Sequence, residues 1–215
     1  MTKIRQSPYG TMNGTLGNLI GGSWRGIGYL RVRPANVHDK NSLKQQNQRA
    51  RFKACVSFTK SLRIDLVNPV WEQHAVKQTA SNLFVKTNMP VFDSSGAITD
   101  YGNLKISIGS LPLPKNIVVQ NDGTTAGAIR ITWDDNSGKD IAASTDRLRV
   151  VYITGTDAVV MEGLVFTRNE GLATIQLAGV SGQTVHVYVF FEDEASETFS
   201  ESFYAMVAIP IAPAN

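Results

Sequence analysis

The chain has 215 residues, of which 42% are hydrophobic, and its net charge of +3 is the sum of two opposed halves. Residues 1–90 carry fourteen Lys and Arg against three acids, a net of +11, whereas residues 91–215 carry seven against fifteen, a net of −8. The hydrophobic fraction excludes disorder over the whole chain. The single cysteine, Cys55, excludes an intramolecular disulfide and any multi-cysteine metal site. The charge asymmetry favours assembly or polyanion binding over catalysis.

The N-terminal residues predict no signal peptide, because no apolar stretch follows the first basic residues. No apolar run reaches the roughly 20 residues of a membrane span, and the longest, near 205–214, is interrupted by Pro210 and Pro213. We therefore expect a soluble chain without a membrane partner. It would be cytoplasmic at synthesis, and a virion or another particle is one expected destination.

Residues 8–34 form a glycine-rich arm, with seven glycines between Gly10 and Gly28. Glycine allows close backbone approach but gives weak independent structure. From Ile27 to Pro34 the residues alternate as in a strand, with Tyr29 and two arginines on one face and Leu30 and Val32 on the other. We expect the arm to be extended, to pair with another strand and to dock on another surface. Its predicted subunit-interaction residues are Trp24, Ile27, Tyr29, Arg31 and Arg33.

Residues 39–88 carry helix signals. Ser42 with Gln45 three positions later predicts a capping box, and apolar residues recur on one stripe from residue 43 to 58. Asn68 followed by Pro69 predicts a second helix start, with helical character to about residue 80. From residue 82 we expect extended chain, because Pro90 disfavours a helix through that point.

The first of these helices is basic along its surface and contains no acid between residues 42 and 63. Its cations could neutralise phosphates. The alternatives are a solvated face and pairing with the acidic region of a neighbouring subunit. Together they outweigh nucleic acid, because no recognised nucleic-acid module accompanies the charge. The predicted basic surface consists of Arg49, Arg51, Lys53, Lys60 and Arg63.

Residues 111–215 predict a β-sandwich, because short apolar runs alternate with turn formers at regular spacing. One strand has a clear core face from Val185 to Phe191. We divide the chain into domains 1–110 and 111–215. The seven predicted strands are 117–121, 128–133, 147–154, 159–163, 173–177, 185–191 and 203–209. A hairpin provides an acidic surface, or alternatively a solvated loop, with Glu192, Asp193, Glu194, Glu197 and Glu201.

Two resemblances follow from sequence segments. The C-terminal region resembles a fibronectin type III-like domain in "AIRITW", which Trp133 ends, and in "VHVYVFFEDEASETFSES", although Val185 stands where that domain usually has tyrosine. Such a domain implies adhesion, spacing or partner binding. The N-terminal half resembles a family of small uncharacterised proteins common in Bacteroidota and their phages, in "GTLGNLIGGSWRGIGYLRVRP", "NSLKQQNQRARFKACVSF" and "ASNLFVKTN". This resemblance implies a virion or assembly role and supplies no catalytic residues.

The candidate catalytic and ligand motifs are incomplete. Gly21 and Gly26 have the first spacing of a phosphate loop, but the required lysine is absent, so a structural arm is favoured. The loop 134–140 has alternating oxygens, as in a calcium loop, yet Lys139 replaces the glycine and Thr145 the bidentate glutamate. A polar turn is the favoured interpretation.

The remaining titratable candidates also favour structural roles. His38, His74 and His186 have no metal-ligand spacing with one another or with Cys55. His186 alternates with core valines, which predicts the outer face of the sheet. Cys55 is expected to be buried rather than reactive.

The predicted fold is mainly β with a small helical part (α+β). A glycine-rich arm and a helical and extended module precede a seven-stranded, fibronectin type III-like sandwich. The predicted function is a non-enzymatic structural or assembly protein, without cofactor, metal or small-molecule substrate, whose partners are itself or other assembly proteins. The alternative is a nucleic-acid-binding protein that uses helix 42–63. An enzyme would need a composite site between subunits.

Overall fold

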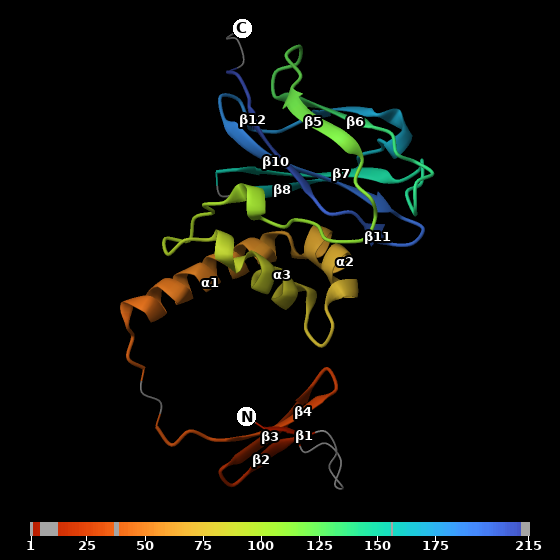
Figure 1. Cartoon of the computed structure of the whole chain (residues 1–215). Coiled ribbons are helices and arrows are strands. Elements are labelled where there is room, and N and C mark those ends of the chain that lie inside the picture. The colour runs from red at the N-terminus through yellow and green to blue at the C-terminus, as the bar shows by residue number, and fades with distance from the viewer. Residues whose placement is uncertain (1, 5–12, 37–38, 156, 212–215) are drawn as a thin grey trace.

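The computed structural model describes residues 2–4, 13–36, 39–155 and 157–211. They form an N-terminal sheet, a layer of helices and a β-sandwich, in that order across the molecule (Figure 1). The chain is thus mainly β with a few helices. Within these residues, no helix has the length and apolarity that a membrane span requires.

The glycine-rich arm folds into a small antiparallel sheet. Its strands are β1 (Thr2–Ile4), β2 (Gly14–Leu16), β3 (Leu19–Trp24) and β4 (Ile27–Val32), in the order β1-β4-β3-β2. Arg25 and Gly26 connect β3 to β4 with φ of 44° and 76°, the positive values that a two-residue hairpin turn requires. The strand predicted from Ile27 is confirmed, and its partners belong to the same N-terminal segment.

The helical layer begins with α1 (Leu43–Ser61), whose predicted capping box is confirmed. The Gln45 amide donates to Ser42 Oγ at 3.4 Å, and the Ser42 amide donates to Gln45 Oε1 at 2.9 Å. The helix continues through η1 (Arg63–Val67) into α2 (Asn68–Trp71) and η2 (Glu72–His74). The predicted helix start at Asn68 is found, because α2 begins there with Pro69 in its first turn, but Asn68 is not the cap. The chain is already helical in η1, and Asn68 itself has helical φ and ψ of −66° and −54°.

Two further expectations for this layer are wrong. Helical structure stops at His74 rather than near residue 80, and the segment predicted to be extended forms α3 (Ala80–Asn88). Thr79 caps α3 by accepting from the Asn82 amide at 3.1 Å. Pro90 lies beyond α3, in η3 (Met89–Val91), where the first turn of a new helix tolerates proline.

After η4 (Tyr101–Asn103), the chain forms two facing sheets. One has the order β5-β6-β9, and the other has the order β11-β10-β7-β8 with β12 also paired to β10. All seven predicted strands are present, with ends within two residues of prediction, and β11 is additional. The strands are β5 (Lys115–Asn121), β6 (Ala128–Asp134), β7 (Arg147–Thr154), β8 (Asp157–Met161), β9 (Leu172–Gln176), β10 (Thr184–Asp193), β11 (Thr198–Phe199) and β12 (Phe203–Ala208).

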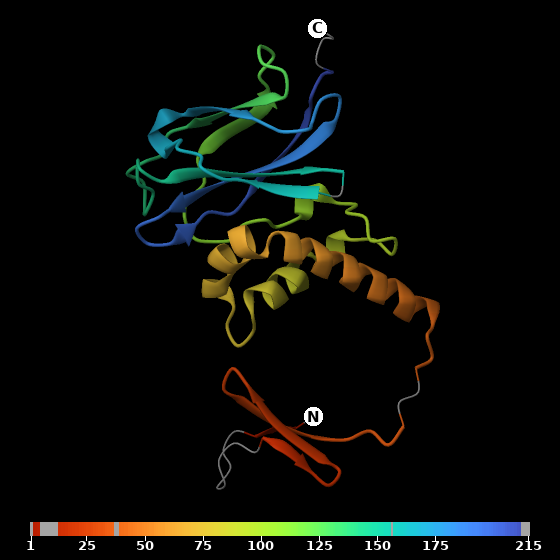
Figure 2. The same cartoon turned by 180° about the vertical axis from the view of Figure 1, so that it is seen from behind.

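The second of these sheets is buried on both faces. Its inner face packs against the other sheet, and Trp133 meets Phe191 there edge to face at 5.5 Å between ring centroids. Its outer face presents Tyr188 and Phe190 to the helices, in a second core that includes Trp71. The helices cover this face in both views (Figures 1 and 2). The regions 43–110 and 111–211 therefore share a core, and the N-terminal sheet lies outside it.

Candidate interaction surfaces

The N-terminal sheet has apolar residues on both faces and a core on neither. Because Leu19 pairs with Val32, Gly21 with Leu30 and Ser23 with Gly28, the side chains of β3 and β4 on one face are aliphatic except for Ser23. All residues of β2, β3 and β4 are exposed or half-exposed. The most exposed large apolar side chains are those of Leu16 (69%), Val32 (60%), Trp24 (54%) and Leu19 (41%).

The predicted interaction residues of the arm divide between these faces. Trp24, Ile27, Tyr29 and Arg31 lie on the face opposite Val32, by the same register. Tyr29 covers Gly22 so closely that a Cβ on this glycine would lie 2.6 Å from the tyrosine hydroxyl. Arg33 is exposed, and its amide donates to the Asn18 carbonyl at 2.8 Å. The sheet is therefore held together by its own hydrogen bonds, while the side chains of β2, β3 and β4 on both faces stay exposed or half-exposed.

Arg25, in the β3–β4 turn, joins the sheet to the helical layer. Its guanidinium contacts Glu72 at 2.6 Å and donates to the carbonyls of Ala75, at 3.3 Å, and Gln78. The hydrogen bond from Arg25 and another from the Ala80 amide lower the pKa of the Glu72 carboxyl. Among the described residues, this contact involves the turn of the hairpin and not the exposed apolar side chains of the two faces.

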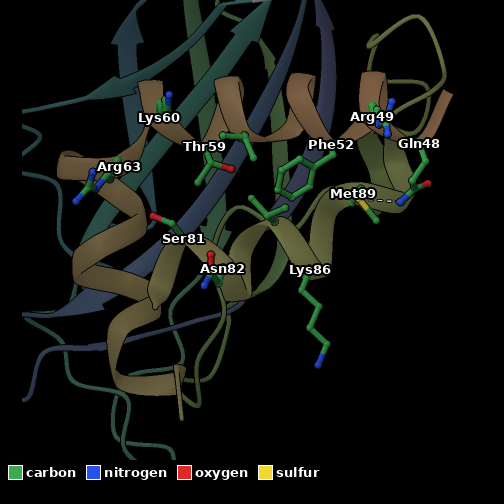
Figure 3. A pocket seen from close by; sticks show the side chains of 12 residues that line it. Gln48, Arg49, Phe52, Thr59, Lys60, Arg63, Ser81, Asn82, Lys86 and Met89 are labelled. Atoms are coloured by element: carbon green, nitrogen blue, oxygen red, sulfur yellow. Dashed lines mark hydrogen bonds between the residues drawn. The ribbon is translucent and has the colours of Figure 1, made fainter. Parts of the chain in front are cut away.

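A groove of about 680 Å³ runs between α1 and α3. Residues spaced three or four apart on each helix line it, so it follows one face of α1 and one of α3. Phe52 and Val56 of α1 and Val85 and Met89 beside them supply the apolar floor (Figure 3). The polar lining residues are Gln48, Arg49, Thr59, Lys60, Arg63, Ser81, Asn82 and Lys86.

The predicted basic surface divides at this groove. Arg49, Lys60 and Arg63 line it, whereas Arg51 and Lys53 are exposed elsewhere on α1. Arg49 also contacts Asp39 at 2.7 Å, and this hydrogen bond lowers the pKa of the aspartate. Lys86, which belongs to α3 and was not predicted, adds a fourth cation.

The predicted acidic surface is largely engaged within its own chain. Glu192 contacts Arg149 at 3.2 Å, Glu194 contacts Arg147 at 2.5 Å and Glu201 contacts Lys105 at 3.7 Å. The other two acids shape the hairpin. Asp193 accepts from the Ala195 amide at 3.0 Å, and Glu197 has a positive φ of 52°. These contacts reduce the negative charge available to a second subunit.

A buried arginine that the sequence analysis missed organises one end of the sandwich. Arg168 is fully buried; its Nε contacts Asp146 at 2.8 Å, and its Nη1 donates to the Pro112 carbonyl at 2.9 Å and to Asn136 Oδ1 at 2.6 Å. Its guanidinium also lies 4.6 Å from the Phe191 ring centroid. Asn136, a residue of the calcium-loop alternative, thus serves as an internal acceptor. The sequence contains no local motif that predicts the role of Arg168, because its partners lie more than 20 residues away in the sequence.

The other titratable candidates are also built into the fold. His186 stacks on Tyr101 at 3.5 Å between centroids and shares a hydrogen bond of 2.8 Å with the Tyr204 hydroxyl. Burial lowers the pKa of His186 and raises that of Cys55 to about 11. His74 is exposed, and His38 lies outside the described residues. Within the described ranges, no three His, Cys, Asp or Glu residues could together hold a metal ion.

Comparisons with known proteins add a family and a fold likeness. A model of a family of unknown function, DUF6266, matches residues 11–206. A search of curated proteins found no match. One similar solved structure is the fn3 domain of human collagen alpha-1(XX) chain, at 15% identity over 49% of this chain and 93% of that one, with a TM-score of 0.32. Another is the third fibronectin III domain of human KIAA0343 protein, at 12% identity over 50% and 90%, with a TM-score of 0.34.

Proposed function

We propose that this chain, which belongs to the family of unknown function DUF6266, is a non-enzymatic assembly protein whose N-terminal sheet docks on a neighbouring subunit. The observation that carries this proposal is the exposure of apolar side chains on both faces of the N-terminal sheet, in whose strands β2, β3 and β4 no residue is buried. A sheet normally buries at least one face, so this one is expected to find its cover in another chain.

The apolar side chains suffice to drive such docking. Full burial of a large apolar side chain contributes roughly 1.5–3 kcal/mol, so Leu16, Leu19 and Val32, which share one face and are partly covered already, would together contribute at most about 4.5–9 kcal/mol. This range is comparable to the estimated 4–15 kcal/mol cost of association. Additional backbone pairing is available at β2, which is an edge strand of the sheet.

The proposed contact is heterologous, because the sheet of one subunit meets a different surface of the next. Contacts of this kind generate rings or filaments. The sequence resemblance to proteins of Bacteroidota and their phages favours a virion-like particle as the assembly.

Light scattering after size-exclusion chromatography tests this proposal. The wild type is expected to form oligomers that persist at high salt, because the contact is apolar. Leu16→Ser with Val32→Ser should yield monomers, whereas the control Val165→Ser, on a side chain 76% exposed in the sandwich region, should not. A wild-type monomer at high concentration would refute apolar docking. Oligomers that dissociate in salt would instead indicate pairing of basic and acidic surfaces.

Nucleic-acid binding by α1 is the second candidate function. It is favoured by the exposure of Arg51 and Lys53 on a helix without acids. Anisotropy with generic DNA and RNA at low ionic strength tests it. Changing Arg49, Arg51 and Lys53 to Gln should weaken binding and flatten its salt dependence. Absence of salt-sensitive binding would eliminate this candidate.

A further inference from the structure

We propose that the groove between α1 and α3 binds an acidic amphipathic helix of a different protein. The described residues that line the groove belong to the helical layer, and Arg25 of the N-terminal sheet borders a neighbouring hollow with two of them, Arg63 and Ser81. The proposal does not depend on the assembly function. In Figure 3 the strands of the sandwich lie behind both helices, so the groove is on the side of the helices away from the sandwich, which is the side of the N-terminal sheet in Figure 1. A partner can reach it without displacing any part of the shared core.

The floor of the groove is suited to apolar side chains. Phe52 remains 53% exposed although it stands on a helix whose other large ring, Phe58, is buried. The hydroxyl of Thr59 donates to the Cys55 carbonyl at 2.6 Å, which satisfies its main polar group within α1. Val56 and Val85 continue the floor between the two helices. An occupant therefore gains by burying apolar groups here.

The shape of the groove is suited to a helix. Its lining runs along α1 from Gln48 to Lys60 and continues to Arg63 at the start of η1, a length of about 22 Å at the rise of an α-helix. A helix of about 15 residues spans that distance. It would lie between α1 and α3 as a third helix and place its residues at i, i+3, i+4 and i+7 on the floor.

The rim of the groove selects negative charge. Arg49, Lys60, Arg63 and Lys86 line it, and the described lining residues include no carboxylate. In the described part of the chain, Arg49 alone among these four has a carboxylate partner, Asp39. Acids on both flanks of an apolar stripe would pair with these cations.

The described part of this chain does not supply such a helix. Helices α1 and α3 contain no Asp or Glu, and α2 has only four residues. The acidic hairpin of a second copy has the charge but not the apolar stripe, because its Phe199 is buried. The occupant is thus expected to be a segment of another protein.

Two other anionic ligands fit the groove less well. A fatty acid carries one carboxylate at one end, whereas the cations lie at both ends of the groove, with Arg49 at one and Lys60 and Arg63 at the other. Nucleic acid bases stack on aromatic rings, but the floor around Phe52 is aliphatic. An amphipathic helix uses the floor and the rim together.

Fluorescence anisotropy with a labelled synthetic helix tests the proposal on the full chain. The probe is a peptide of about 18 residues with leucines at i, i+3, i+4 and i+7 and glutamates on both flanks. We expect saturable binding, weakened about tenfold or more by Phe52→Ser and by Lys60→Gln with Arg63→Gln. The matched control is Arg51→Gln with Lys53→Gln, which removes the same charge from α1 outside the groove and should leave affinity within about twofold.

Several outcomes would overturn the proposal. One is no binding at roughly 100 μM peptide. Another is equal loss of affinity in the control pair, because net charge rather than the groove would then explain binding. A third is equal binding of a peptide with lysines in place of the glutamates. A fourth is displacement of the peptide by single-stranded DNA together with an unchanged peptide affinity of Phe52→Ser. That result would indicate that the cations of the groove bind nucleic acid. Circular dichroism confirms that each variant is folded.

Discussion

Replacement of Arg168 by Met is expected to destabilise the protein by about 3–5 kcal/mol, the usual cost of removing one partner of a buried ion pair. In this variant Asp146, whose side chain is 0% exposed, would remain charged without its arginine partner. The donor left to its Oδ2 would be the Ala143 amide, at 3.0 Å. The Pro112 carbonyl and Asn136 Oδ1 would also lose the donor Nη1. The free energy of unfolding of native domains is only about 5–15 kcal/mol, so this loss would remove a large share of it.

Urea unfolding followed by tryptophan fluorescence measures the effect. The buried Trp71 and Trp133 both contribute to this signal, and the indole of Trp133 donates to the Arg168 carbonyl at 2.7 Å. The exposed Arg130→Met is the control and should change stability by less than about 0.5 kcal/mol. Adding Asp146→Asn to Arg168→Met removes the stranded charge and retains an acceptor for the Ala143 amide, so the double variant should be more stable than Arg168→Met. If the two changes are additive instead, the ion pair contributes nothing and the reasoning is refuted.

Three further outcomes are expected. A Cβ on Gly109 would lie 1.9 Å from the Phe199 carbonyl oxygen, so Gly109→Ala should lower the melting temperature strongly. The control is Gly102→Ala, which should not, because the atom nearest to its Cβ would be 3.7 Å away. Equal melting temperatures of the two variants would contradict this reasoning. Because the pKa of Cys55 is raised to about 11, its thiol should react with a disulfide reagent at pH 8 only after denaturation; rapid reaction of the native protein would show that the site opens. Burial lowers the pKa of His186, so the unfolded state binds its proton first and stability should fall as pH drops below about 6.5; His186→Phe should remove that slope, and an unchanged slope would assign it to other groups.

The strands were predictable because their signals are local. Alternation from Val185 to Phe191 and turn formers between runs placed every sandwich strand except the short β11 to within two residues. The helix α3 was not predictable in this way. Its segment looks extended beside Pro90, but Phe84 packs on Trp71 at 5.0 Å and on Phe58 at 6.3 Å. These partners are known only once the chain is folded.

The same limit applies to the candidate site. The basic character of α1 could be read directly, yet which cations line the groove depends on where α3 lies, and so Lys86 was missed. One readable signal was overlooked. Tyr188 and Phe190 interrupt the valines of β10 with further apolar residues, a pattern typical of a strand buried on both faces. That pattern indicates a cover on the outer face of the sheet, which the helices provide.

The shared core also has a consequence for synthesis of the chain. The helices come before β7 and β10 in the sequence, but their apolar faces are completed by Val151, Ile153, Tyr188 and Phe190. Translation from residue 110 to residue 193 takes roughly 4–17 s at the usual rates of elongation. During that interval Trp71 and Phe84 have no sheet to pack against. A chaperone or the ribosome surface is therefore expected to hold the nascent helices until β10 has emerged.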